Sequence, residues 1–265
     1  MSEKPIIRTE WDGVIELVLN RPEKLNAINY EMMDILTQAV IDLRDDPEFR
    51  VMLIRAKGRY FSAGADLSEE VRFKIGDSPA RTRNFARNHL LTGMSALWTE
   101  MERVEKPIVV AHHATCVGGG LEMSLSCDFR LAAQSAAYSF PELEFGILPL
   151  SGGVSRLTRI VGPHWARWLV LAKERMDAQL ALSAGLVHRI IPDEEFEEEV
   201  KAFARRLSGF SPEAMAIGKT TIELCALLGT DDARAVERLS YGTLQFSPDY
   251  KVLQAARKAK HSKAE

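Results

Sequence analysis

The sequence is short of the residues that mark several protein classes. Its 265 residues include three cysteines, Cys116, Cys127 and Cys225, and these form no Cys-x-x-Cys pair. An odd number of scattered cysteines is typical of free buried thiols in a reducing compartment, not of a disulfide framework or a zinc site. No sign of charge dominates, because 34 basic and 37 acidic residues leave a net charge of −3. This balance argues against a nucleic-acid-binding protein or one held on an anionic membrane.

Long hydrophobic runs are lacking as well. The most apolar stretch, 107–127, is interrupted by His112, His113, Glu122 and three glycines. It therefore falls short of the roughly 20 apolar residues that a membrane helix needs. The first ten residues contain acids and no apolar run, which is not the pattern of a signal or transit peptide. We expect a cytoplasmic protein that binds neither membrane nor nucleic acid.

What is present is typical of a globular α/β protein. Hydrophobic residues make up 46% and charged residues 27% of the chain, and its length suits one large domain or two modest ones. Short apolar runs alternate with amphipathic helices, and after Gly162 the patterns are almost wholly helical. We expect a core domain over 1–195 and a helical region over 196–265. The polar segment Leu67–Arg87 is predicted to be the most mobile part. Strands are expected at Ile6–Glu10, Val14–Leu19, Val51–Ala56, Ile108–Ala111, Phe129–Ala132 and Val187–Ile191.

Two loops of small residues each follow a predicted buried strand. Ser62–Asp66 follows the first, and Gly118–Gly120 follows the second and precedes a helix. Glycines before a helix expose backbone N–H groups where the helix dipole is positive, so the second loop suits developing negative charge. It is neither a dinucleotide fingerprint nor a P-loop. Taken alone, each loop is also compatible with an ordinary tight turn.

Two carboxyl groups stand out as a candidate base and acid. Glu122 lies in the first turn of the helix after the glycines, where the dipole is expected to lower its pKa. Glu142 follows Pro141 and is flanked by apolar residues, so burial is expected to raise its pKa. Glu144 is the competing candidate for the second role. One ionised and one protonated carboxyl would form a matched base and acid.

These loops and acids belong to a longer series of motifs along the chain. The series is Arg21-Pro22-Glu23-Lys24-Leu25-Asn26-Ala27, Phe61–Leu67, Gly118–Glu122, Cys127-Asp128, Phe140-Pro141-Glu142, Gly146, Gly152-Gly153 with Arg156-Leu157, and Ala184–Val187. Taken in order, these motifs closely resemble the crotonase superfamily, and within it enoyl-CoA hydratases match best. The resemblance runs from about residue 6 to about residue 230.

The resemblance implies a crotonase-type α/β fold, a spiral of ββα units with a helical C-terminal region that builds trimers, commonly paired into hexamers. It places two oxyanion-hole amides at Ala65 and Gly119 and two catalytic glutamates at Glu122 and Glu142. It implies an acyl-CoA substrate and no metal or separate cofactor, because coenzyme A is part of the substrate. The positions that match its substrate and CoA contacts are Lys24, Leu25, Ala27, Ala63, Asp66, Leu67 and, for an amide that holds water, Leu150.

Three departures from the family pattern bear on the substrate. His112-His113-Ala114 replaces an Asn-Gly turn, and we expect a structural or pocket-shaping role for the two histidines. The Ser151–Val154 segment is similar to that of carnitinyl-CoA dehydratases. The aromatic residue that is usual near the adenine is missing from the segment Ala256–Lys260, where Arg257 is the candidate to replace it by stacking and phosphate contact. We expect an enoyl-CoA hydratase, with an isomerase or a carnitinyl-CoA dehydratase-like enzyme as the alternative and a non-catalytic or RNA-binding relative as a remote one.

Overall fold

The computed structural model describes residues 4–67, 79–80, 83 and 93–261. Most of the segment predicted to be mobile, Leu67–Arg87, lies outside the described residues. Among the helices that are described, none is both long and apolar enough to cross a lipid bilayer.

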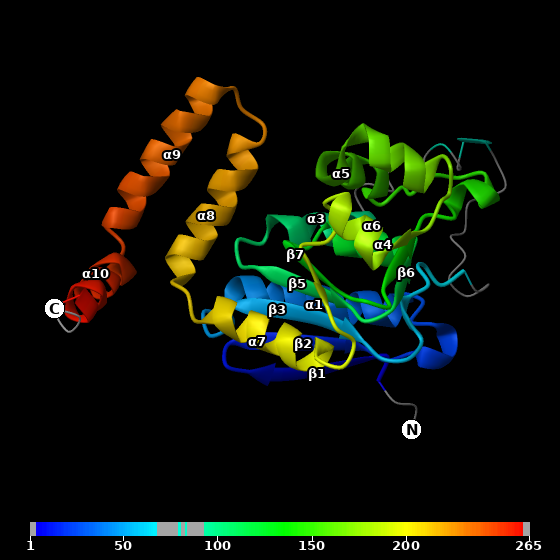
Figure 1. Cartoon of the computed structure of the whole chain (residues 1–265), viewed down its shortest axis with the longest axis horizontal. Helices are drawn as coiled ribbons and strands as arrows, with labels where there is room; N and C mark the ends of the chain where they lie inside the picture. Colours follow the sequence, from blue (N-terminus) through cyan, green and yellow to red (C-terminus); the bar gives the residue numbers. More distant parts are fainter. Residues whose placement is uncertain (1–3, 68–78, 81–82, 84–92, 262–265) are drawn as a thin grey trace.

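A six-stranded sheet forms the base of the molecule, with the strand order β1-β2-β3-β5-β7-β10 (Figure 1). The predicted hairpin is confirmed, because β1 and β2 pair antiparallel around the Asp12-Gly13 turn. Ile6 lies opposite Leu19 at one end of the pair, and Trp11 lies opposite Val14 at the other. The remaining neighbours pair parallel. The strands are β1 (Ile6–Trp11), β2 (Val14–Leu19), β3 (Val51–Ala56), β5 (Ile108–His112), β7 (Phe129–Ala133) and β10 (Arg189–Ile191).

The central strands are buried on both faces, which explains their continuous apolar runs. In β3, Met52 and Ile54 join one hydrophobic cluster, while Val51 and Leu53 join a second cluster on the other face. Helix α1 (Tyr30–Asp45) packs into the first cluster and α7 (Phe196–Ser208) into the second. Asn29 caps α1 as predicted, because its side chain accepts a hydrogen bond from the Met32 amide. The sheet is thus enclosed between two layers.

A smaller sheet has the order β4-β6-β8-β9 and gives the fold its spiral form. Each of β3, β5 and β7 in the large sheet is followed by a short strand, β4, β6 or β8, in the small one. The chain therefore alternates between the sheets, as the predicted spiral of ββα units requires. The short strands are β4 (Tyr60–Ser62), β6 (Thr115–Val117), β8 (Ala137–Ser139) and β9 (Met176–Asp177).

Short helices and turns follow the small-sheet strands and carry the loops of interest. Helix α4 (Gly119–Leu125) follows β6, and the 3₁₀ turn η3 (Glu142–Phe145) follows β8. Helix α5 (Gly153–Val170) is broken at Gly162, where two predicted helices meet. The other elements of this part are η1 (Pro22–Lys24), α3 (Gly93–Arg103) and α6 (Ala178–Ser183).

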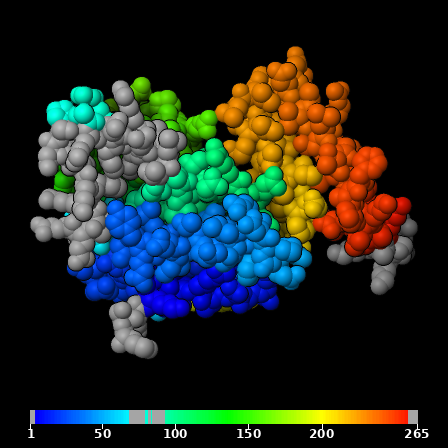
Figure 2. Space-filling view, turned by 180° about the vertical axis from the view of Figure 1, so that it is seen from behind, coloured from blue at the N-terminus to red at the C-terminus, as the bar shows by residue number. Residues whose placement is uncertain are grey.

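Three C-terminal helices form an arm that extends away from the sheets (Figures 1 and 2). Helices α8 (Pro212–Cys225) and α9 (Thr230–Gln245) pack against each other and have no buried residue. Helix α10 (Pro248–His261), which the sequence patterns did not predict, lies at the end of the arm. The proposed division of the chain at residue 195 stays a prediction. Cys116 and Cys127 are buried free thiols, whereas Cys225 on α8 is partly exposed, so its predicted burial was wrong.

Candidate active site

The two small-residue loops meet at the ends of β4 and β6. A Cβ built on Gly119 would lie 3.1 Å from the Ala65 nitrogen, and one built on Gly64 would lie 3.1 Å from the Gly119 nitrogen. The parallel pairing of β4 with β6 brings these loops together, although they are far apart in the sequence. The close approach of the two backbones therefore depends on the absence of a side chain at both glycines.

The amide nitrogens of Ala65 and Gly119 are available as hydrogen-bond donors. Ala65 forms an isolated parallel bridge with Ile28, in which the hydrogen bonds use the Ile28 amide and the Asp66 amide. Gly119 is the first residue of α4, where the amide has no partner within the helix. Within the described part of the chain, neither nitrogen donates a backbone hydrogen bond. Two such donors close together form the kind of site that stabilises an oxyanion.

The Glu142 carboxyl group reaches the glycine loop from η3. Its Oε1 atom would lie 2.7 Å from a Cβ built on Gly118, so the carboxyl occupies the space that a side chain would fill there. Gly118 has φ of 52° and ψ of −126°, a backbone conformation that suits glycine. The Glu142 Oε2 atom is buried and has no hydrogen-bond partner among the described residues. By contrast, Glu144 is exposed and pairs with Lys173 at 3.2 Å.

The Glu122 carboxyl group is held by the turn that precedes α5. Its Oε1 atom accepts hydrogen bonds from the Ser151 amide at 2.7 Å and the Gly153 amide at 3.3 Å. A Cβ built on Gly153 would lie 2.8 Å from the same oxygen, so this position also has no room for a side chain. Glu122 is only 5% exposed. Two backbone donors on one oxygen favour the ionised carboxylate.

Burial is the largest cause of the pKa shift of both glutamates. Burial, with a smaller contribution from the negative charge of Glu122, raises the pKa of Glu142 to about 7, although a hydrogen bond to its own backbone opposes the shift. Burial also raises the pKa of Glu122, although the Ser151 and Gly153 amides and the charge of Arg156 oppose this effect. The expected lowering of the Glu122 pKa by the helix dipole was therefore wrong. Helix α4 is only seven residues long, and its dipole does not offset the loss of solvent around a side chain this deeply buried.

The residues predicted to contact CoA lie along two adjacent segments. The Ala63 amide donates to the Leu25 carbonyl at 2.9 Å, and the Ile28 amide donates to the Gly64 carbonyl at 2.8 Å. These bonds place Leu25 and Ala27 beside Ala63. Leu67 is 65% exposed and Leu150 is 51% exposed, and the Lys24 side chain is also exposed. The structure therefore brings the first six positions together, and it places Leu150 separately, in the turn that leads to α5.

Among the residues predicted to contact CoA, Asp66 forms an ion pair with Arg21. Its carboxylate contacts the Arg21 guanidinium at 3.0 Å, and the same guanidinium nitrogen donates to the Ala27 carbonyl at 2.6 Å. Both side chains are largely buried, with 16% and 13% exposed for Arg21 and Asp66. The ion pair between Asp66 and Arg21 thus ties the two segments to each other.

The two adjacent histidines have separate environments. His112 is fully buried, its ring contacts Phe61 and Tyr138, and its Nδ1 lies 3.2 Å from the Tyr138 hydroxyl. Burial lowers the pKa of His112 to about 3, so the ring is neutral. His113 Nε2 lies 2.7 Å from the Gly58 carbonyl. No group of three or more His, Cys, Asp or Glu residues with metal-binding geometry occurs in the described ranges.

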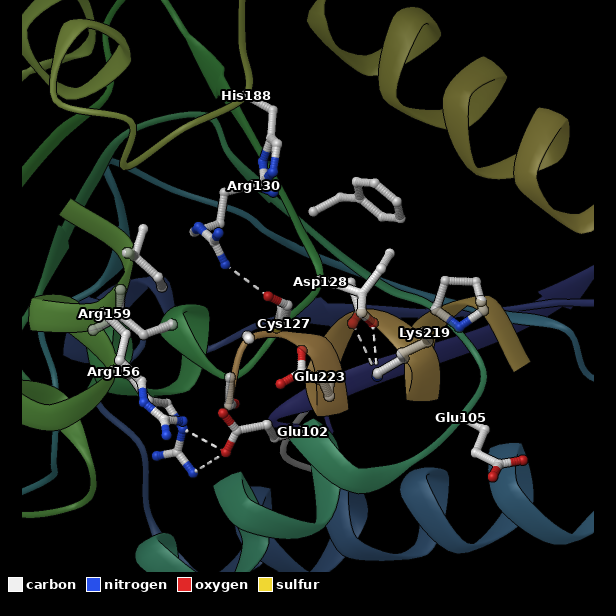
Figure 3. Close-up of a pocket in the computed structure, with 18 of the residues that line it drawn as sticks. Glu102, Glu105, Cys127, Asp128, Arg130, Arg156, Arg159, His188, Lys219 and Glu223 are labelled. Carbon is white, nitrogen blue, oxygen red and sulfur yellow. Dashed lines mark hydrogen bonds and ion pairs between the residues drawn. The ribbon is translucent and has the colours of Figure 1, made fainter. Parts of the chain in front are cut away.

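A separate cavity of about 680 Å³ lies between the core and α8 (Figure 3). Arg156 pairs with Glu102 on one wall, and Lys219 of α8 pairs with Asp128 on another. None of Ala65, Gly119 and Glu142 lines this cavity. Arg156 connects this cavity to the candidate active site, because its Nη1 donates to the Ser151 carbonyl at 3.0 Å.

Sequence reasoning missed the residues that hold Glu122. The Ser151 and Gly153 amides and the Arg156 side chain act on a carboxylate that lies about 30 residues earlier in the chain. The only available signal was the Gly152-Gly153 pair with Arg156, which formed part of the resemblance but indicated no specific contact.

Comparisons with known proteins identify the family and the fold of the chain. The family model described as enoyl-CoA hydratase/isomerase matches residues 9–238. A probable enoyl-CoA hydratase of Mycobacterium bovis is 34% identical over 215 residues, which cover 81% of this chain and 79% of that protein. A carnitinyl-CoA dehydratase of Salmonella typhi is 34% identical over 204 residues, covering 77% and 74%. A crystal structure of an enoyl-CoA hydratase subunit I from Geobacillus kaustophilus matches with a TM-score of 0.85 and 30% identity, covering 97% and 95%.

Proposed function

This chain belongs to the enoyl-CoA hydratase/isomerase family, and on that premise we propose that it is an enoyl-CoA hydratase. The reaction is the syn addition of water to a trans-2-enoyl-CoA thioester, or the reverse dehydration. The observation that carries the proposal is that the Glu142 carboxyl group lies against the glycine loop that bears the Gly119 amide, and that the Glu122 carboxyl group, from the helix after this loop, is near enough for its charge to act on Glu142. A site of this composition suits acid–base chemistry next to a polarised carbonyl group.

The two amides act on the thioester oxygen. Attack of water on the β-carbon transfers negative charge to that oxygen and forms an enolate-like state. The Ala65 and Gly119 amides would donate to it, and they need no reorganisation because the loops already hold them in place. Each donor of this kind is worth about 3 kcal/mol of barrier reduction.

The two glutamates divide the proton transfers. Ionised Glu122, which carries two amide hydrogen bonds, accepts a proton from water as the hydroxyl group bonds to the β-carbon. Protonated Glu142, whose pKa is raised to about 7, gives a proton to the α-carbon. The proton gained by Glu122 then returns to Glu142 through solvent, which restores the starting state. Positioned transfers of this kind contribute about 10²- to 10⁴-fold to the rate.

The CoA moiety would lie along the paired segments around Leu25 and Ala63. The small side chains of Ala27 and Ala63 permit close contact with a ligand, and the exposed Lys24 ammonium suits a CoA phosphate. In this proposal Ala27, Asp66 and Leu67 complete the contact surface, and Leu150 borders the acyl group. No metal or redox cofactor takes part in any step.

A carnitinyl-CoA dehydratase-like activity is the second candidate, with an isomerase close to it. The observation that favours it is the Ser151–Val154 turn, which supports Glu122 and is similar to the turn of those dehydratases. A change in this turn affects the acyl side of the site and not the amide donors. The same two carboxyl groups serve elimination of water in the reverse direction.

The proposal is tested with purified protein and a panel of trans-2-enoyl-CoA substrates of increasing chain length, together with carnitinyl-CoA. Wild type should hydrate at least one enoyl-CoA, and Glu122→Gln and Glu142→Gln should each lower kcat by about 10²- to 10⁴-fold. Glu144→Gln is the matched control, because Glu144 belongs to the same 3₁₀ turn but is exposed, and it should keep wild-type turnover. Full activity in either of the first two variants would refute the assignment of the acid pair.

A further inference from the structure

Arg156 connects the turn that holds Glu122 to helix α3. From α5, its Nε and Nη2 atoms both donate to one carboxylate oxygen of Glu102, at 3.0 and 2.9 Å. Its Nη1 atom donates to the Ser151 carbonyl at 3.0 Å. The guanidinium also packs against Gly152, where a built Cβ would lie 1.8 Å from Nη1. Arg156 is 8% exposed, so little of its surface is in contact with bulk solvent.

The Ser151 peptide lies directly between Arg156 and Glu122. Arg156 binds the carbonyl oxygen of Ser151, while the amide of the same residue donates to Glu122 Oε1 at 2.7 Å. Fixing Ser151 and Gly152 also fixes the Gly153 amide, the second donor to that oxygen. A rigid planar fork that binds two acceptors at once is a property of arginine and not of lysine.

We propose that Arg156 is a positioning residue for Glu122, which fixes the amide turn that orients the carboxylate and supplies a positive charge that favours its ionised form. This inference rests on the proposed function, because it assigns Glu122 the role of base. Arg156 itself has no contact with the reacting atoms in this proposal.

The charges around Glu122 define what a pH measurement will report. Glu142 of η3 opposes its ionisation, while Arg156 of α5 and the Ser151 and Gly153 amides favour it. Arg156 is in turn balanced by Glu102 of α3. Removing the positive charge should therefore raise the pH at which Glu122 ionises, and the acidic limb of the pH–rate profile should move to higher pH.

The test compares Arg156→Met, Arg156→Lys and the matched control Arg159→Met. Arg159 is an exposed arginine one turn further along α5. Arg156→Met should lower kcat roughly 10- to 100-fold with little change in KM, because the base is misplaced, and should shift the acidic limb upward. Arg156→Lys should lower kcat but leave the acidic limb of the pH–rate profile at its wild-type position, because lysine retains the positive charge but lacks the planar guanidinium fork. Arg159→Met should match wild type in both.

A purely structural role predicts a different result. In that case Arg156→Met would lower the melting temperature but leave kcat and the acidic limb of the folded enzyme unchanged, and this outcome would overturn the inference. An identical acidic limb in the lysine and methionine variants would overturn it as well. If Arg156→Met fails to fold, the double variant Glu102→Gln/Arg156→Met takes its place, because it leaves no charge unpaired, and the same shift is expected.

A measurement without substrate separates this inference from the proposed function. Glutamate labelled with ¹³C at the carboxyl carbon allows NMR titration of Glu122, with Glu122→Gln for assignment. The midpoint should move to higher pH in Arg156→Met and stay at the wild-type value in Arg156→Lys and Arg159→Met. An unchanged midpoint in Arg156→Met would overturn the inference. If the midpoint moves as expected but wild type hydrates no enoyl-CoA, the proposed function fails and the positioning of Glu122 stands.

Discussion

At the scale of single residues, Glu122 and Glu142 differ in what their oxygens contact. Glu122 carries two amide hydrogen bonds on one oxygen, whereas Glu142 has a buried oxygen that finds no partner in the described part of the chain. A hydroxyl-bearing carboxyl in a dry environment is a proton donor, and an amide-bound carboxylate is a proton acceptor. Two identical side chains thus acquire different roles from their surroundings, and this difference has a measurable consequence in pH dependence.

We predict that kcat/KM for hydration falls as the pH rises through about 7. Burial raises the pKa of Glu142 to about 7, so above this pH the group loses the proton that it must deliver, while below it the proton is retained. The measurement is kcat/KM between pH 5 and 9, obtained at each pH from initial rates at substrate concentrations below and above KM. A rate that stays constant from pH 6 to 9 would contradict the assignment of Glu142 as the acid.

The sequence was sufficient to identify the two glutamates as candidates but not to predict the acidity of Glu122. Its position after Gly118–Gly120 indicated a helix start, and the dipole argument followed from that position alone. Burial to 5% exposure depends on α5 and the turn before it, which pack on Glu122 from a distant part of the chain. Such contacts leave no periodic signal near Glu122. The predicted direction of its pKa shift was therefore wrong.

At the scale of elements, close packing between α4 and β4 sets the distance between the two loops. A Cβ built on Gly120 would lie 2.6 Å from both Cβ and Oγ of Ser62. The Ser62 hydroxyl donates to the Asn26 carbonyl at 2.9 Å and accepts from the Gly64 amide at 3.1 Å. The glycine at 120 therefore protects the hydrogen bonds that shape the Ala63–Asp66 loop.

We predict that Gly120→Ala destabilises the protein by about 1–3 kcal/mol, because the added methyl group overfills a packed interface. Gly242→Ala on α9 is the matched control, since a Cβ built there meets nothing within 4 Å among the described residues outside its own stretch of helix. The control should be neutral or stabilising by up to about 1 kcal/mol, because alanine is the better helix former. Denaturant unfolding of both variants measures the difference, and equal effects would contradict the packing argument.

Elements with a regular pattern were predicted well. The hairpin, the buried strands Val51–Ala56 and Ile108–Ala111 and the Asn29 cap are confirmed, because each leaves a local signal in composition or spacing. The alternation of strands between two sheets came from the resemblance, since periodicity does not reveal which sheet a short strand joins. Helix α10 was missed, and its residues leave exposed apolar side chains in place of a clear buried stripe.

At the scale of the whole molecule, the C-terminal arm leaves large apolar side chains uncovered. These exposed residues include Ile222, Leu227, Leu239, Tyr241, Phe246 and Val252. Apolar area of this extent is unusual on a monomer surface and is typical of an interface between subunits. We therefore propose that the arm joins copies of this chain into a trimer, or a hexamer of two trimers, as the resemblance implies.

We predict that Leu239→Glu shifts the protein to smaller species by placing a charge in this apolar interface. Leu239 is 68% exposed in the isolated chain. Arg238→Glu is the matched control, because it introduces the same side chain at the neighbouring, already polar position on α9. Size-exclusion chromatography with light scattering measures the mass of each. A monomeric wild type, or a Leu239→Glu variant of unchanged mass, would contradict the proposed role of the arm.

The main-chain origin of the Ala65 and Gly119 donors has a consequence for mutational scanning. An N–H group is retained when the side chain of its residue is exchanged, so a scan that replaces residues one by one with alanine leaves both groups chemically intact. It would not test position 65 at all, because alanine is already there, and at position 119 it would detect crowding by a methyl group 3.1 Å from the Ala65 nitrogen. Replacing the amide by an ester through unnatural amino-acid incorporation is the change that removes the donor itself.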